Sequence, residues 1–151
     1  MGATVKVKGL TEHFGLDEYT IHQTGEIPLT AEAILHAVML EEFRQWLGRP
    51  MKVSAWYRTK EYNAKVSKQP TSSHTRGVAT DWSTNITIDK EKFLKYSKKW
   101  REICKAHGVV GESGLYTWGM HLGSSIKYSK KFYHWDSRTG TQVNMPFSEL
   151  K

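Results

Sequence analysis

The chain has 151 residues, 38% of them hydrophobic, and a formal net charge of +7 at pH 7. This length favours one folded domain over residues 1–151 that buries its own core, and the single cysteine, Cys104, excludes an intramolecular disulfide. No apolar run approaches the roughly 20 residues of a membrane span, so we expect no membrane insertion.

Periodicity and capping signals predict alternating helices and strands after an irregular or short-element lead-in over residues 1–28. The clearest helix begins after Thr30, a suitable N-cap, and ends before Gly48 and Pro50. Its expected buried stripe is Ile34, Leu35, Val38, Met39, Phe43, Trp46 and Leu47. The further elements, in order, are a strand over 51–56, a short helix from Thr59 to Val66, a loop over 69–73, a strand over 77–82, a helix from Asp89 to about His107, and strands over 109–110, 115–122 and 131–136. This order favours an α+β domain, a small mostly antiparallel sheet with helices packed on one face.

Two histidines and one aspartate form a candidate metal site. His74 ends a polar loop, Asp81 lies seven residues later in the next predicted strand, and His134 lies in a late strand. Two imidazoles and a carboxylate suit zinc and leave a fourth position for water, whereas structural zinc sites mostly use several thiolates. The plainer interpretation is a solvent-exposed loop histidine and a hydrogen-bond acceptor at the end of a strand.

The residues around this set resemble a known family. The pattern Ser-x-His-x-x-Gly-x-Ala-x-Asp over residues 72–81 follows Ser-Ala-Trp-Tyr-Arg at 54–58, and His-x-Asp-x-Arg comes at 134–138. Together they are similar to the zinc D-Ala-D-Ala carboxypeptidases and L-Ala-D-Glu endopeptidases, peptidoglycan peptidases that include phage endolysins. The resemblance covers about residues 12–138. It implies the fold that these peptidases share with hedgehog domains, and a Zn²⁺ ion bound by His74, Asp81 and His134.

The resemblance also implies catalytic residues. Arg58 matches an arginine that these enzymes aim at the scissile carbonyl or the substrate carboxylate, where a guanidinium stabilises an oxyanion. Many members carry the general base three residues before the last zinc histidine, but this position here is Lys131. We therefore expect Asp136 to be the base, or to orient a zinc ligand, with Glu112 as the alternative. The expected substrate-binding residues are Ser72, Tyr133 and Trp135.

The expected reaction is hydrolysis of an amide in the peptide stems of peptidoglycan by zinc-activated water, as a carboxypeptidase or an endopeptidase. The basic charge suits an anionic wall, and no apolar signal core follows Met1. Both favour a monomeric phage or prophage lysis enzyme that stays in the host cytoplasm until it is released to the wall. The alternative, favoured by Lys131, is a non-catalytic zinc-containing binding domain of the same fold. Nucleic-acid binding would rest on charge alone and is not expected.

Overall fold

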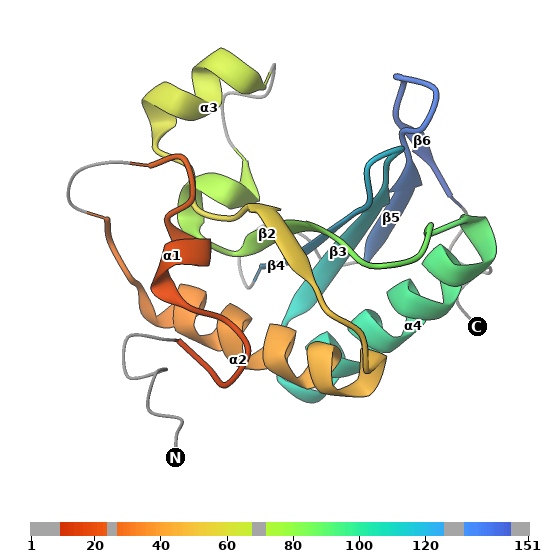
Figure 1. Cartoon of the computed structure of the whole chain (residues 1–151), viewed down its shortest axis with the longest axis horizontal. Helices are drawn as coiled ribbons and strands as arrows, with labels where there is room; N and C mark the ends of the chain where they lie inside the picture. Colours follow the sequence, from red (N-terminus) through yellow and green to blue (C-terminus); the bar gives the residue numbers. More distant parts are fainter. Residues whose placement is uncertain (1–9, 24–26, 68–71, 126–131, 146–151) are drawn as a thin grey trace.

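A mostly antiparallel sheet forms the centre of the molecule (Figure 1). The computed structural model describes residues 10–23, 27–67, 72–125 and 132–145, and within them the sheet has six strands in the order β1-β2-β4-β3-β5-β6. All neighbouring strands are antiparallel except β3 and β5, which are parallel. The elements are α1 (Leu16–Tyr19), α2 (Ala31–Leu47), β1 (Lys52–Ala55), α3 (Lys60–Val66), the 3-10 helix η2 (Ser73–Arg76), β2 (Ala79–Ser83), α4 (Lys90–Ala106), β3 (Val110–Leu115), β4 (Met120–Ser125), β5 (Tyr133–Asp136) and β6 (Val143–Asn144).

The two long helices, α2 and α4, pack side by side against one face of the sheet (Figure 1). Phe43 of α2 lies between Trp82 of β2 and Trp100 of α4, with ring centroids 5.6 and 6.1 Å away. All three side chains are completely buried, and burial of such large rings is a main contribution to stability. The α+β fold class is therefore confirmed. None of the helices that the structure describes is long and apolar enough to cross a membrane.

Helix α2 has the predicted ends, but its buried face matches the predicted one only in part. Thr30 accepts a hydrogen bond from Ala33 N at 3.2 Å, and Gly48 adopts the left-handed conformation with φ +68°. Three residues of the predicted stripe are nevertheless exposed by about 40% or more, namely Ile34, Val38 and Trp46. Met39 and Phe43 of the predicted stripe are completely buried, and Leu35 and Leu47 pack against the core. The other buried residues of the helix are Ala33, His36, Ala37, Leu40 and Glu41. Apolar residues lie on more than one face of α2, so periodicity alone identified only part of the buried face.

The strand predicted over 115–122 is two strands joined by a turn. Strand β3 ends at Leu115, β4 begins at Met120, and Tyr116 N donates to Gly119 O at 2.9 Å. Gly119 has φ +152°, and a Cβ atom there would lie 2.2 Å from Trp82 O. Only glycine fits such a close backbone approach. The turn brings Tyr116 and Trp118 together at one end of the hairpin, beside the site described next.

Candidate metal centre

Three side chains from different elements meet on the sheet face opposite α2 and α4. His74 lies on η2, Asp81 on β2 and His121 on β4, and their ligand atoms lie within 4.8 Å of one another. Asp81 and His121 are direct partners in the antiparallel pairing of β2 with β4, which puts both side chains on one face. All three residues are at most 7% exposed. The cluster is therefore a buried set of two imidazoles and one carboxylate.

Hydrogen bonds fix the orientation of His74. Its Nδ1 lies 2.6 Å from Trp56 O. A carbonyl only accepts, so Nδ1 is the donor in this bond, and Nε2 faces the cluster, 3.3 Å from Asp81 Oδ2. The 3-10 helix that carries His74 is capped by Ser72, whose Oγ accepts from His74 N at 3.2 Å. His74 is thus held in the tautomer and direction that a metal ligand needs.

His121 lies between two carboxylates. Its Nδ1 is 2.8 Å from Asp81 Oδ1, and its Nε2 is 2.6 Å from Glu112 Oε2. Burial disfavours the charged imidazole, but the hydrogen bonds to Asp81 and Glu112 outweigh it and raise the pKa of His121 to about 10. Burial raises the pKa of a carboxyl, but the pKa values of Asp81 and Glu112 nevertheless lie below their usual range. The cause is His74 and His121 for Asp81, and His121 for Glu112. The cluster thus favours positive charge, which is the setting that a divalent cation requires.

The chemical types of the ligand atoms also suit a metal ion. Two imidazole nitrogens and one carboxylate oxygen form a three-ligand set of the type found in catalytic zinc sites, with a fourth position left for water or substrate. The carbonyl of Trp56 behind His74 is a typical outer partner that fixes a ligating imidazole. The predicted ligands His74 and Asp81 therefore lie together in a site that could hold a metal ion.

The third predicted ligand, His134, does not join them. It pairs with Ser113 in the parallel ladder of β3 and β5, and Ser113 Oγ donates to Ser97 Oγ of α4 at 2.7 Å. The His134 ring also lies 6.4 Å from the ring of Phe93 of α4. His134 is therefore on the helix-covered face of the sheet, and its assignment as a ligand is corrected to His121.

Asp136 lies on the same face as His134, because it follows two residues later on β5. It pairs with Leu115 of β3, a completely buried core residue, and its carboxylate binds the guanidinium of Arg138 at 2.7 Å. It is not among the residues that line the cleft around the cluster. The prediction of Asp136 as the general base is thus corrected, and Glu112, the alternative, is the carboxylate beside the cluster. Lys131 lies outside the described residues.

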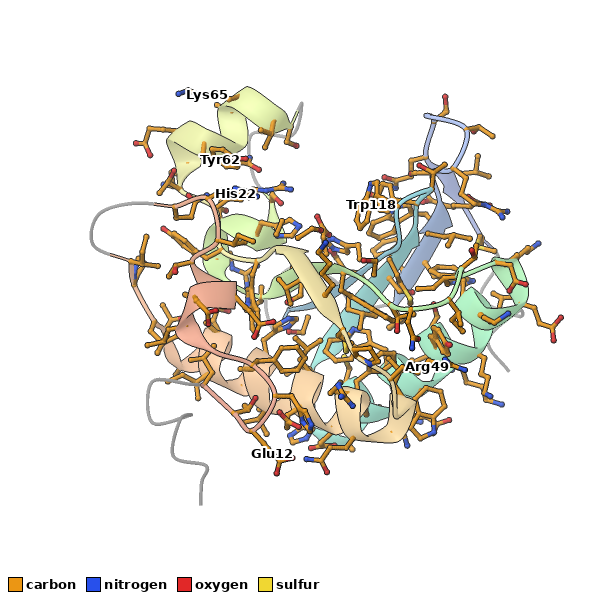
Figure 2. All side chains as sticks on the ribbon, in the orientation of Figure 1. Glu12, His22, Arg49, Tyr62, Lys65 and Trp118 are labelled. Atoms are coloured by element: carbon orange, nitrogen blue, oxygen red, sulfur yellow. The ribbon has the colours of Figure 1, made fainter. Side chains whose placement is uncertain are left out.

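The cluster opens into a cleft of about 600 Å³. Val66 and Ser67, from the end of α3, line one side, and Gln142 and Asn144, near β6, line the other. Figure 1 shows α3 and β6 on opposite sides of the molecule, and Figure 2 shows Tyr62 of α3 across from Trp118. The further lining residues are Arg58, Ser72, Ser73, His74, Asp81, Glu112, Tyr116, Trp118, His121, Tyr133 and Trp135.

The other predicted site residues all line this cleft. Arg58 Nη2 lies 3.5 Å from Asp81 Oδ2, and its backbone N–H donates to His74 O at 2.9 Å. Tyr133 is 51% exposed and Trp135 is 8% exposed. Both alternate with His134 along β5, so they face the cleft, whereas His134 faces the helices. Ser72, Tyr133, Trp135 and Arg58 are thus brought to the cluster, and their roles stay predictions.

Sequence reasoning missed His121. It stands in a predicted strand without a recognised motif around it, whereas His134 begins the pattern His-x-Asp-x-Arg. The available signal was the turn at 116–119, which divides the predicted strand and makes residue 121 the second position of a new strand. That signal does not by itself show that the new strand pairs with β2.

A buried cluster of two histidines and one aspartate, beside a carboxylate in an open cleft, defines a candidate metallohydrolase. A family model described as Peptidase M15 matches residues 5–117, more than half of the chain. The chain therefore belongs to the peptidase M15 family, and this family is one of metallopeptidases. The matched range contains His74, Asp81 and Glu112 but ends before His121, which is placed by the structure. No curated protein and no solved structure matches the chain.

Proposed function

We propose that this protein is a zinc peptidase that hydrolyses amide bonds in the peptide stems of bacterial peptidoglycan. The observation that carries the proposal is the buried His74–Asp81–His121 cluster with Glu112 Oε2 2.6 Å from His121 Nε2. His74, Asp81 and His121 would hold the zinc ion. The ion would polarise the scissile carbonyl and lower the pKa of water towards 7.

Glu112 is the proposed general base. Burial opposes ionisation, but its bond to His121 outweighs burial and keeps its pKa below the usual range, so the carboxylate is charged at neutral pH. Ser73 Oγ donates to the same oxygen at 3.4 Å, which helps to orient the group. A charged, fixed carboxylate in the cleft is suited to take a proton from the attacking water and to pass it to the leaving amine.

Arg58 is the proposed stabiliser of the oxyanion. Its guanidinium contacts Asp81 at 3.5 Å, and its side chain is 17% exposed. Arg58 also lines the cleft beside the cluster, which places its guanidinium close to the position of a bound substrate. A fixed donor in a partly desolvated cleft stabilises developing negative charge more strongly than the same donor in water. Ser72, Tyr133 and Trp135 would contact the bound peptide.

The peptidoglycan substrate and a role in phage lysis are the finer parts of the proposal. The net charge of +7 supports them, because a basic protein is attracted to an anionic wall. We propose that the protein acts from the host cytoplasm once the membrane has been opened. Production in bacteria should then cause lysis only after chemical permeabilisation of the inner membrane. Intact cells after permeabilisation would reject the lysis role without affecting the proposed chemistry.

Digestion of purified peptidoglycan, followed by mass spectrometry of the products, tests the proposed reaction. The wild type should release stem-peptide fragments whose masses identify the bond that is cut. Glu112→Gln should keep its zinc and lose activity by a factor of roughly 10² or more, whereas the matched variant Asp136→Asn should stay active. No release by a zinc-loaded wild type would favour the non-catalytic binding domain. If Asp136→Asn loses activity and Glu112→Gln does not, Asp136 is the general base.

A further inference from the structure

A second pocket adjoins the catalytic cleft. It has a volume of about 450 Å³ and lies between the segment that follows β2 and the β3–β4 turn. This volume falls in the range of roughly 300–1,000 Å³ that is typical of small-molecule sites. Tyr116 and Trp118 line both the cleft and this pocket. The two aromatic side chains therefore form a shared wall, and a ligand in the second pocket would lie next to a peptide in the cleft.

The shared wall is a fixed and exposed aromatic platform. The rings of Tyr116 and Trp118 stack with centroids 4.7 Å apart and an interplanar angle of 11°. Trp118 is nevertheless 45% exposed, so its area outside the stack is open to a ligand. Figure 2 shows Trp118 at the end of the β3–β4 hairpin. Trp135 Nε1 donates to Tyr116 Oη at 3.1 Å, which anchors the platform to β5.

The remainder of the second pocket is uncharged and mostly polar, with Ile86 and Ile88 as its apolar side chains. Its hydroxyl and amide side chains are Ser83, Thr84, Asn85, Thr87 and Thr117, and the described lining contains no acidic or basic residue. Arg49 Nη1 donates to Asn85 Oδ1 at 3.1 Å, and Thr84 Oγ1 donates to Pro50 O at 2.6 Å. These bonds orient part of the polar lining from outside the pocket. The lining chemistry therefore suits a neutral ligand with many hydroxyl or amide groups, not an ion.

We propose that the second pocket binds a pyranose ring of a glycan strand, an N-acetylated amino sugar. The C–H face of a pyranose carries partial positive charge and matches the negative face of the Trp118 ring. The hydroxyl and acetamido groups of the sugar would bond to the threonine and asparagine side chains. The identity of the sugar rests on the proposed function, because the stem peptides of peptidoglycan are attached to such sugars. Trp118 would then place the glycan while the peptide enters the cleft.

Binding of a soluble tetramer of N-acetylglucosamine tests the proposal without any hydrolysis. The indole N–H signal of Trp118, assigned from its absence in Trp118→Phe, should shift on titration in the NMR spectrum. Trp118→Ala should weaken binding about tenfold or more, and Trp118→Phe should retain part of the affinity. Thr87→Trp, which fills a position that lines only the second pocket, should also weaken binding. The matched control is Trp46→Ala, since Trp46 is similarly exposed at 39% but lies on α2.

Each outcome separates this proposal from the proposed function. Sugar binding that depends on Trp118 and Thr87 supports the pocket even if no peptide bond is cut. Peptide hydrolysis without any shift at Trp118 overturns the pocket and leaves the peptidase intact. Equal weakening in Trp46→Ala, or full binding in Thr87→Trp, would also contradict the proposal. The first result would show non-specific attraction, and the second would place the sugar outside this pocket.

Discussion

His36 should make the stability of the protein fall steeply in mild acid. It is completely buried between α2 and the sheet, with Nδ1 3.0 Å from Ser124 Oγ and Nε2 3.0 Å from Thr80 Oγ1. The rings of Trp56 and Trp100 each lie 5.6 Å from the imidazole. Burial, together with the nearby charges of His121 and His74, lowers the pKa of His36 from 6.5 to about 3. The folded protein therefore keeps this imidazole neutral.

The sign and size of the effect follow from proton linkage. Between about pH 3 and pH 6.5 the unfolded chain binds a proton at His36 that the folded protein does not bind, so stability falls as the pH falls. Each pKa unit corresponds to about 1.4 kcal/mol, so His36 lowers the free energy of unfolding by about 3 kcal/mol between pH 6.5 and pH 4. The contribution is fully present above pH 6.5, and the total loss reaches about 5 kcal/mol near pH 3.

Urea denaturation of the wild type, His36→Gln and His36→Asn at several pH values between 7 and 4 measures this effect. Both variants should be less stable than the wild type at pH 7, by about 1–3 kcal/mol, because Ser124 or Thr80 loses a hydrogen-bond partner. Both should also lose about 3 kcal/mol less than the wild type on going to pH 4. The two variants serve as controls for each other, because neither side chain titrates. An equal fall in all three proteins would refute the assigned pKa and its cause.

Substitutions at Arg58 and Gly123 test the catalytic cleft, and a substitution at Gly77 tests the packing of the segment that carries His74. Arg58→Ala should lower kcat by roughly 10²-fold with zinc retained. Arg58→Lys should restore little of this activity, because a point charge does not replace the guanidinium fork. Near-normal turnover in Arg58→Ala would show that Arg58 takes no part in the reaction. Gly123→Ala should also lower kcat with zinc retained, because its Cβ would lie 2.6 Å from Glu112 Cγ and displace the carboxylate; wild-type turnover would show that Glu112 need not hold this position. Gly77→Ala should destabilise the protein more than the matched Gly48→Ala in urea denaturation. Both glycines have φ near +70°, but only a Cβ at Gly77 would meet Tyr19 Oη. Equal losses of stability in the two variants would mean that backbone strain alone accounts for the effect at Gly77.

Local signals in the sequence predicted the helices well. Thr30, Thr59 and Asp89 each accept a capping hydrogen bond at the predicted start of a helix, because an N-cap depends on residues within one turn. The buried face of α2 was predicted only in part, because that helix carries apolar side chains on more than one side and buries the polar His36 through two hydroxyl partners.

Of the three cluster residues, only the two that lie close together in the sequence were predicted. His74 and Asp81 share one motif, and both reached the cluster. The choice between His121 and His134 depended on sheet order and on which face each side chain occupies. Strand periodicity shows that residues alternate, but it does not show which alternate set faces the helices. The same ambiguity moved the proposed base from Asp136 to Glu112, since β5 presents Tyr133 and Trp135 to the cleft and His134 and Asp136 to the other face.

The zinc content of two matched alanine variants, His121→Ala and His134→Ala, tests the central claim most directly. Both histidines are buried, at 7% and 2% exposure, so both variants should first be shown to be folded by circular dichroism. Metal analysis should then give about one zinc per chain in the wild type and in His134→Ala, and a clear loss in His121→Ala. Retention of zinc in His121→Ala together with its loss in His134→Ala would contradict the metal centre described for this fold.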